Sequence, residues 1–190
     1  MIVIEGVLNE IKENLFRLSS DEAKKSAAKF VPTANKIYGV RLPGINALAK
    51  KYKEHGFPLI EALWQSGWYE ERLLVAKLLT SNCRNDPERT LELLKRFKDD
   101  IDNWAVCDTL CSEGIRPLIK KHGDEVQSLA EEFLKSDKMW VRRMGIVMLI
   151  HFAKIPEKKA KVRQLVAPLA ADHEHYIKKA IVWINRYLDK

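Results

Sequence analysis

Apolar residues along this chain are spaced almost entirely as they are in helices. They recur at intervals of three and four in nearly every segment, while the alternation typical of strands is nearly absent. Asp86 followed by Pro87 is a good helix start, because Asp caps the first turn and Pro needs no N–H there. Gly114 and Gly123 are predicted helix ends. The pattern predicts helices over residues 3–18, 21–30, 44–55, 58–64, 68–79, 87–98, 103–114, 115–121, 124–134, 138–152, 158–171 and 174–188.

The later part of the chain repeats with a fixed period. Trp68, Trp104, Trp140 and Tyr176 are each 36 residues apart, and the apolar residues of the helices before them share this register. Each unit is therefore a pair of helices, as in HEAT repeats, although those usually span roughly 40–47 residues. We expect an all-α fold, an α-α superhelix or HEAT-like repeat solenoid of paired antiparallel helices with a concave basic groove. Residues 1–190 are predicted to form one domain, with a helical cap over 1–55 and helix pairs over 56–190.

Charge and cysteine content narrow the class of function. The net charge is +7 and the cations are spread along the chain, which favours a polyanionic partner, above all nucleic acid. The three cysteines form no even disulfide set, and Cys107 and Cys111 are expected to be buried on one helix face. We therefore predict reduced thiols, no metal site and a cytoplasmic location. No stretch is long and apolar enough to suggest a membrane segment, and the N-terminus lacks the pattern of a secretory signal.

One face of the second helices carries the candidate chemistry. Counted from the aromatic residue as zero, positions 0, 3, 4 and 7 share a face, and the core is predicted on the more apolar positions between them. Second helices usually line the concave side of a solenoid. Trp104, Asp108, Arg143 and Trp183 are therefore predicted to converge in the groove. The alternative is structural: a repeated Trp is more often a packing residue, and Asp108 can simply pair with a neighbouring arginine.

Several short motifs resemble a known family. They are the W-x-x-x-D segment from Trp104 to Asp108, the W-x-x-R segment from Trp140 to Arg143, the segment 176–183 and the segment 38–43 followed by 48–50. In this order they resemble the AlkD-like DNA alkylation repair proteins, which are HEAT-like DNA glycosylases. The resemblance runs from about residue 38 to residue 187. Seven residues follow Trp183, where fuller members are expected to carry a further helical repeat.

The resemblance implies an activity and a site. The activity is hydrolytic excision of N3- and N7-alkylated purines from duplex DNA, without a cofactor and without a metal. Asp108 is implied as the catalytic carboxylate, Trp104 and Trp183 as walls against the sugar-phosphate of the lesion, and Arg143 as the cation that holds the backbone. The partner is double-stranded DNA containing alkylated bases, with no membrane contact, and we expect a monomer. Further cations predicted to contact DNA are Arg41, Arg72, Arg142 and Lys179.

Two other functions remain open from the sequence. A non-catalytic relative could bind distorted or branched DNA, and the joint presence of Asp108 and Arg143 favours the enzyme over that reading. A protein-binding scaffold, the commonest use of α-solenoids, predicts a groove without excess positive charge and binding that ignores salt.

Overall fold

A computed structural model describes residues 2–190, and within that range the chain is helical with no strand. The all-α prediction is therefore confirmed. None of the helices in this part of the chain is both long and apolar enough to cross a bilayer. The α-helices are α1 (Ile2–Leu18), α2 (Asp21–Phe30), α3 (Leu42–Tyr52), α4 (Gly56–Gln65), α5 (Tyr69–Asn82), α6 (Pro87–Phe97), α7 (Trp104–Thr109), α8 (Ile119–Leu134), α9 (Met139–Ala153), α10 (Lys159–Val166) and α11 (His175–Leu188).

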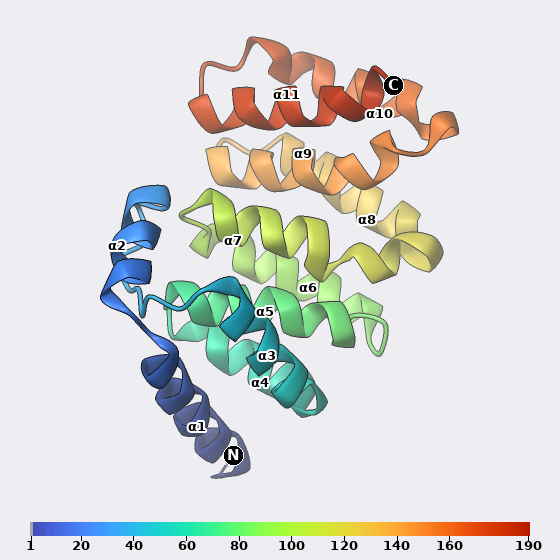
Figure 1. Ribbon diagram of the computed structural model, residues 1–190. Helices are drawn as coiled ribbons and strands as arrows, with labels where there is room; N and C mark the ends of the chain where they lie inside the picture. The colour runs from blue at the N-terminus through green and yellow to red at the C-terminus, as the bar shows by residue number, and fades with distance from the viewer. Residues whose placement is uncertain (1) are drawn as a thin grey trace.

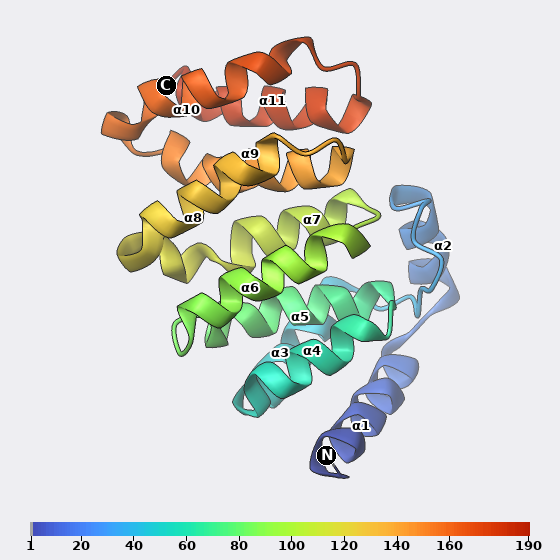
Figure 2. The same ribbon diagram turned by 180° about the vertical axis from the view of Figure 1, so that it is seen from behind.

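The helices from α4 onward are arranged as stacked pairs in chain order. Helices α5, α7, α9 and α11 lie in one layer, seen from the front in Figure 1. Helices α4, α6, α8 and α10 lie in the other layer, seen from the front in Figure 2. Helix α3 packs beside α5, and α1 lies at the N-terminal end of the stack. Helix α2 stands apart, across the ends of the helices at one edge of the front layer.

A continuous apolar core fills the space between the two layers, from Ile11 to Leu188. Trp64 of α4 stacks on Phe97 at the end of α6, with ring centroids 4.1 Å apart and planes 11° apart. Helices α8 and α9 approach each other closely at Gly145, where a Cβ atom would lie 2.8 Å from the carbonyl oxygen of Ala130. The period of 36 residues thus reflects repeated pairwise packing, since each pair buries its apolar faces against its neighbours.

The break predicted at Gly123 is present as a kink. Two helical segments of α8 meet at His122, directly before Gly123, where φ and ψ are −125° and 31°. The predicted helix 103–114 does end at Gly114, but it changes from α to π geometry at Leu110. The Asp86 cap is confirmed, since its side chain accepts a hydrogen bond from the N–H of Arg89 and Pro87 follows it.

The predicted division between core face and groove face is wrong at mid-helix. Val75, Cys107, Cys111 and Val147 lie on the face assigned to the groove, yet all four are fully buried. The tryptophans at the start of the same face are only partly buried. Burial depends on the position along the helix. Neighbouring helices pack against this face one or two turns into the helix, but they do not fully cover its first residue. The separate expectation that Cys107 and Cys111 are buried small residues is confirmed.

A buried carboxylate connects the N-terminal region to the stack. Glu70 of α5 is fully buried and accepts three backbone N–H bonds, from Tyr38 at 2.9 Å, Gly39 at 2.7 Å and Val40 at 3.1 Å. Gly39 has φ of +93°, and a Cβ atom there would lie 2.6 Å from the carbonyl oxygen of Ser20. This loop therefore needs both glycine and the carboxylate to hold its shape.

Replacing Glu70 with Ala is expected to lower the free energy of unfolding by about 3 kcal/mol or more, because three backbone N–H groups in buried or part-buried hydrogen bonds lose their acceptor. Glu70→Gln keeps one acceptor oxygen and is expected to lose less. Denaturant unfolding followed by circular dichroism measures both. The exposed Glu92→Ala on α6 is the control, with an expected change within about 0.5 kcal/mol. Equal stabilities of Glu70→Ala and Glu92→Ala would refute this role.

Candidate active site

Asp108 lies in a short helix whose start is firmly fixed. Asn103 caps α7, since its buried side-chain oxygen accepts a hydrogen bond from the N–H of Val106 at 3.0 Å. Asp108 follows one turn later, and the π-helical turn Leu110–Gly114 begins two residues after it. Such turns are rare and occur often at functional sites. The local structure thus sets the direction of Asp108 within the front layer.

The carboxylate of Asp108 is held by the guanidinium of Arg143 from the next helix pair. Nε of Arg143 donates to Oδ1 at 2.9 Å, and Nη2 donates to Oδ2 at 2.8 Å. This two-pronged geometry fixes both oxygens and the plane of the carboxyl group. The Arg143 side chain is 6% exposed and that of Asp108 is 15% exposed, so solvent reaches the carboxylate more than the arginine.

A third helix completes the arrangement. Nη1 of Arg143 donates to the backbone carbonyl of Tyr176 in α11, and the Tyr176 ring lies 5.9 Å from the guanidinium carbon. Trp140, at the start of α9, tilts against the same ring at 4.8 Å. Arg143 therefore joins α7, α9 and α11, and its orientation is set by groups on both neighbouring helices.

Burial and the ion pair act in opposite directions on these two groups. Burial raises the pKa of the Asp108 carboxyl above its ordinary value, and the hydrogen bonds and charge of Arg143 offset only part of this effect. For Arg143, burial favours loss of the proton, but the Asp108 carboxylate outweighs it and raises the pKa of the guanidinium. Asp108 is thus a carboxylate that takes up a proton at higher pH than a solvated aspartate does.

The two tryptophans of the predicted site lie on the outer helices of this group. Trp104 is partly buried one turn before Asp108, and its indole N–H donates to the carbonyl of Phe30, the last residue of α2, at 2.8 Å. Trp183 is partly buried in α11 and packs against the core. The structure thus brings Asp108 and Arg143 into direct contact and holds Trp104 against α2. Trp183 comes two turns after Tyr176, whose carbonyl Arg143 binds.

The other predicted DNA contacts are in different situations. Arg41 is exposed and pairs with Glu22 at 2.8 Å. Arg72 donates to the carbonyl of Asp100 at 2.7 Å, and Arg142 pairs with Asp172 at 3.0 Å. Lys179 is exposed on α11. Arg72 and Arg142 therefore form hydrogen bonds within the protein. Arg41 and Lys179 lie exposed on the surface.

Sequence reasoning missed the partners that orient the site. The carbonyls of Tyr176 and Phe30 hold Arg143 and Trp104. Every residue carries a backbone carbonyl, so no side-chain pattern could have marked these two. The sequence pattern singled out only the aromatic side chain of Tyr176, whereas Arg143 binds the backbone carbonyl of that residue.

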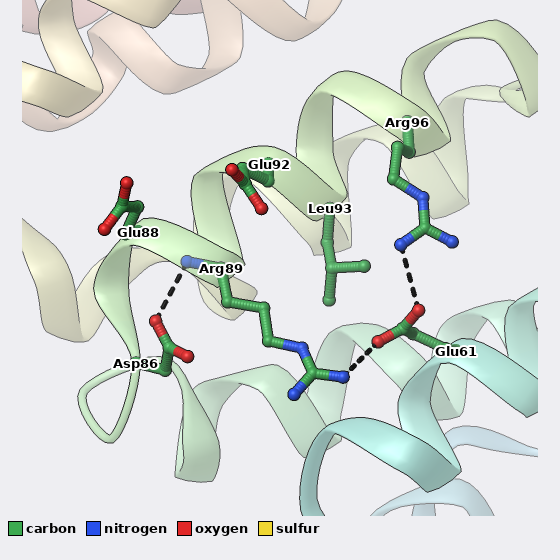
Figure 3. A pocket seen from close by; sticks show the side chains of 7 residues that line it. All are labelled: Glu61, Asp86, Glu88, Arg89, Glu92, Leu93 and Arg96. Atoms are coloured by element: carbon green, nitrogen blue, oxygen red, sulfur yellow. Dashed lines mark hydrogen bonds and ion pairs between the residues drawn. The ribbon is translucent and has the colours of Figure 1, made fainter.

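A separate hollow on the opposite layer is an ion-pair network. Figure 3 shows Glu61 of α4 between Arg89 and Arg96 of α6, with distances of 2.5 Å and 2.9 Å. Asp86 beside it caps α6. Both arginines are thus paired with Glu61 and Asp86 is used in capping, while Glu88 and Glu92 also line the hollow. No group of three or more His, Cys, Asp or Glu side chains that could hold a metal ion is found among residues 2–190.

Removing one member of the Asp108–Arg143 pair is expected to be costly and pH-dependent. Arg143→Met leaves a buried carboxylate unpaired and should lower the free energy of unfolding by about 3–5 kcal/mol at neutral pH. Without its partner, the folded-state pKa of Asp108 rises further above the unfolded value. Stability is then retained below the unfolded pKa and lost as the pH rises through the folded pKa. The deficit measured by urea unfolding should therefore shrink as the pH is lowered towards the ordinary pKa of aspartate.

The double variant Arg143→Met with Asp108→Asn removes the unpaired charge and should recover part of this loss. Arg17→Met, which breaks a pair with 73% and 68% exposed side chains, is the control and should change stability by about 0–1 kcal/mol. A deficit that is independent of pH and is not reduced in the double variant would contradict a buried ion pair.

Comparison with known proteins identifies the family. No curated protein matches the chain. The model of a family described as DNA alkylation repair enzyme matches residues 11–188, a range that includes Asp108, Arg143 and both tryptophans. The match confirms the predicted resemblance, and the chain therefore belongs to the DNA alkylation repair enzyme family.

Proposed function

We propose that this protein is a DNA glycosylase that hydrolyses the N-glycosidic bond of N3- and N7-alkylated purines in duplex DNA. The observation that carries the proposal is the Asp108 carboxylate, partly exposed and held at both oxygens by Arg143, in a chain of the DNA alkylation repair enzyme family. A fixed carboxylate is suited to stabilising positive charge that develops during bond cleavage.

The chemistry of the lesion requires little else from the protein. An N3- or N7-alkylated purine carries a positive charge, so it leaves as a neutral base when the bond to C1′ of the sugar breaks and its electron pair stays on the base. Positive charge then develops on the sugar, as in glycoside hydrolysis generally. Asp108 stabilises that charge and orients the water that adds to C1′, and the proton that this water loses passes to solvent. The base therefore departs without a general acid.

Arg143 is assigned to positioning the carboxylate. The resemblance implied that it holds the DNA backbone, but its side chain is 6% exposed and donates to Asp108 and to the Tyr176 carbonyl. These contacts favour a role in keeping Asp108 ionised and its oxygens in place. An electrostatic interaction within a partly desolvated site is also stronger than the same interaction in water.

The fold supports a groove for duplex DNA. We infer that the helix pairs form a HEAT-like superhelix and a single domain, with the layer of α5, α7, α9 and α11 lining its concave side. Trp104 and Trp183 are then the walls against the sugar-phosphate of the lesion. Exposed cations such as Lys179 and Arg41 contact phosphates, and the net charge of +7 makes DNA binding dependent on salt. The protein acts as a monomer, in the cytoplasm.

A non-catalytic DNA-binding role is the second candidate. The same ion pair favours it in one respect, since both Asp108 oxygens are already bonded within the protein. In that case the pair only fastens α7 to α9, and substitutions change stability without any excision to lose. A direct assay of base release separates the two functions.

Release of 7-methylguanine from duplex DNA tests the proposal. Wild-type protein should excise the base, and Asp108→Asn should lower the single-turnover rate by about 10²–10⁴-fold through loss of the carboxylate charge. Arg143→Lys should also lower it, because an ammonium group cannot hold both oxygens. Asp124→Asn, whose side chain is 90% exposed on α8, is the matched control and should excise normally. If Asp108→Asn were as fast as wild type, Asp108 would not be the reacting carboxylate; no release by wild type would favour the binding role.

The excision rate should also depend on the protonation of Asp108. Because burial raises the pKa of this group, the rate should fall with decreasing pH at higher pH than an ordinary aspartate would dictate, and level off above the raised pKa. Single-turnover rates measured across pH, after subtraction of spontaneous base loss in the same duplex, give the profile. Asp108→Asn should lack this acid limb. A limb of the same shape in Asp108→Asn would assign the titration to another group.

A further inference from the structure

A second aromatic feature lies one repeat before Trp104 and has no part in the proposed excision. Trp68 directly precedes α5 and lies 36 residues before Trp104, the first residue of α7. Its ring is partly buried and stacks on that of Tyr38, with centroids 4.1 Å apart and planes 29° apart. One face of the indole is therefore covered by Tyr38, and Trp68 also lines two hollows.

Hydrogen bonds from Tyr38 to two acidic residues of α5 hold the pair of rings in place. The hydroxyl of Tyr38 donates to Oε1 of Glu71 at 2.7 Å, and the backbone N–H of Tyr38 donates to Glu70. Burial, and then the bond to Glu71, raise the pKa of Tyr38, so the phenol stays protonated and continues to donate. A platform that is already ordered loses little entropy when a ligand binds.

Two adjoining hollows open against Trp68. One has a volume of about 480 Å³, within the range of about 300–1,000 Å³ common for small-ligand sites. The other has a volume of about 290 Å³. Both are lined by Lys24, Ile37 and Trp68, so they meet at these side chains. The larger hollow is further lined by Phe16, Ser19, Ser20, Asp21 and Tyr38, and the smaller one by Ala28, Ala34, Asn35 and Lys36.

The two hollows differ in chemical character. Aromatic rings wall the larger one, and Phe16 there is 75% exposed, which is unusual for a large apolar side chain. Asp21 also lines it, and a carboxylate can accept a hydrogen bond from an exocyclic amine, as acidic side chains do from cytosine. The smaller hollow has two lysines, Lys24 and Lys36, and no acid among its lining residues. An aromatic space thus adjoins a cationic one.

This combination matches one unit of a nucleic acid. A nucleobase is flat, stacks on aromatic rings and carries amine groups at its edge, while the phosphate attached to its sugar is negative. The place is also consistent with DNA. Helix α2 lines both hollows through Lys24 and reaches Trp104 through the Phe30 carbonyl, so the hollows and the proposed active site share one wall. Neighbouring helices of a stack lie about 8–10 Å apart.

We propose that Trp68 and Phe16 form a stacking site for an unpaired nucleobase of the bound DNA, with its phosphate between Lys24 and Lys36. The site rests on the proposed binding of DNA and is independent of the excision chemistry at Asp108. It gives the protein a preference for duplexes that contain an unpaired base.

A duplex with a single bulged 2-aminopurine tests the site, against the same duplex fully paired. Wild-type protein should bind the bulged duplex roughly tenfold more tightly or better, and stacking should quench the fluorescence of the probe. Trp68→Leu should abolish most of this preference and the quenching while leaving affinity for the paired duplex unchanged. Leu42→Ala is the control. Leu42 is an exposed large apolar residue, at 53%, that lines neither hollow, so the preference should persist.

A conservative variant and a crosslinking experiment test the site even if Trp68→Leu does not fold. Trp68→Phe retains an aromatic ring and should keep at least part of the preference, and circular dichroism reports whether each variant is folded. Photo-crosslinking of wild-type protein to a bulged 5-iodouracil, mapped by mass spectrometry, should label Trp68, Phe16 or Tyr38. Crosslinks confined to other segments, or equal affinity of wild type for both duplexes, would overturn the proposal.

The outcome is separable from that of the excision assay. A bulge preference that depends on Trp68 supports the stacking site even if 7-methylguanine is not released. Conversely, release of 7-methylguanine together with a bulge preference unchanged in Trp68→Leu rejects the stacking site and leaves the proposed glycosylase in place.

Discussion

The contact between Asp108 and Arg143 is the interaction on which the rest of the account depends. It places two opposite charges between α7 and α9, where their side chains are only 15% and 6% exposed. Burying a pair of charges is expensive unless geometry and hydrogen bonding are excellent, and an apolar pair of the same size would often serve stability as well. Here the guanidinium bonds both carboxylate oxygens and a backbone carbonyl of α11. The arrangement therefore fixes the direction of one partly exposed carboxylate, a property that packing alone cannot supply.

Much of this arrangement followed from the sequence because the helix pairs repeat regularly. Residues that are 36 positions apart come to equivalent places in successive pairs. Asp108 stands four residues after its helix-opening aromatic and Arg143 three after the next one, so adjacent helices bring them to the same height. Helix type and approximate limits followed from apolar spacing, and caps such as Asp86 gave good starts. The family resemblance then gave these positions a chemical meaning.

The remaining features depend on tertiary context. Burial of Cys107 and Val147 depends on how deeply each lies between neighbouring helices, which angular position on a single helix does not reveal. The carbonyls of Tyr176 and Phe30 orient Arg143 and Trp104, and any residue could have offered them. The N-terminal region lacks the repeat, so nothing in its sequence placed α2 against α7. Nothing in the sequence distinguishes Glu70 from the other acidic residues of predicted helices. In the structure it accepts three hydrogen bonds from backbone N–H groups of a loop distant in sequence.

The central claim is that Asp108 stabilises positive charge on the sugar, and relative binding of two abasic-site analogues tests it most directly. One analogue carries a protonated nitrogen in the sugar ring and the other is a neutral ring of the same shape. Wild-type protein should bind duplex with the cationic ring more tightly, and Asp108→Asn should lose this difference while keeping its affinity for the neutral one. An equal preference for the cationic ring in both proteins would contradict it.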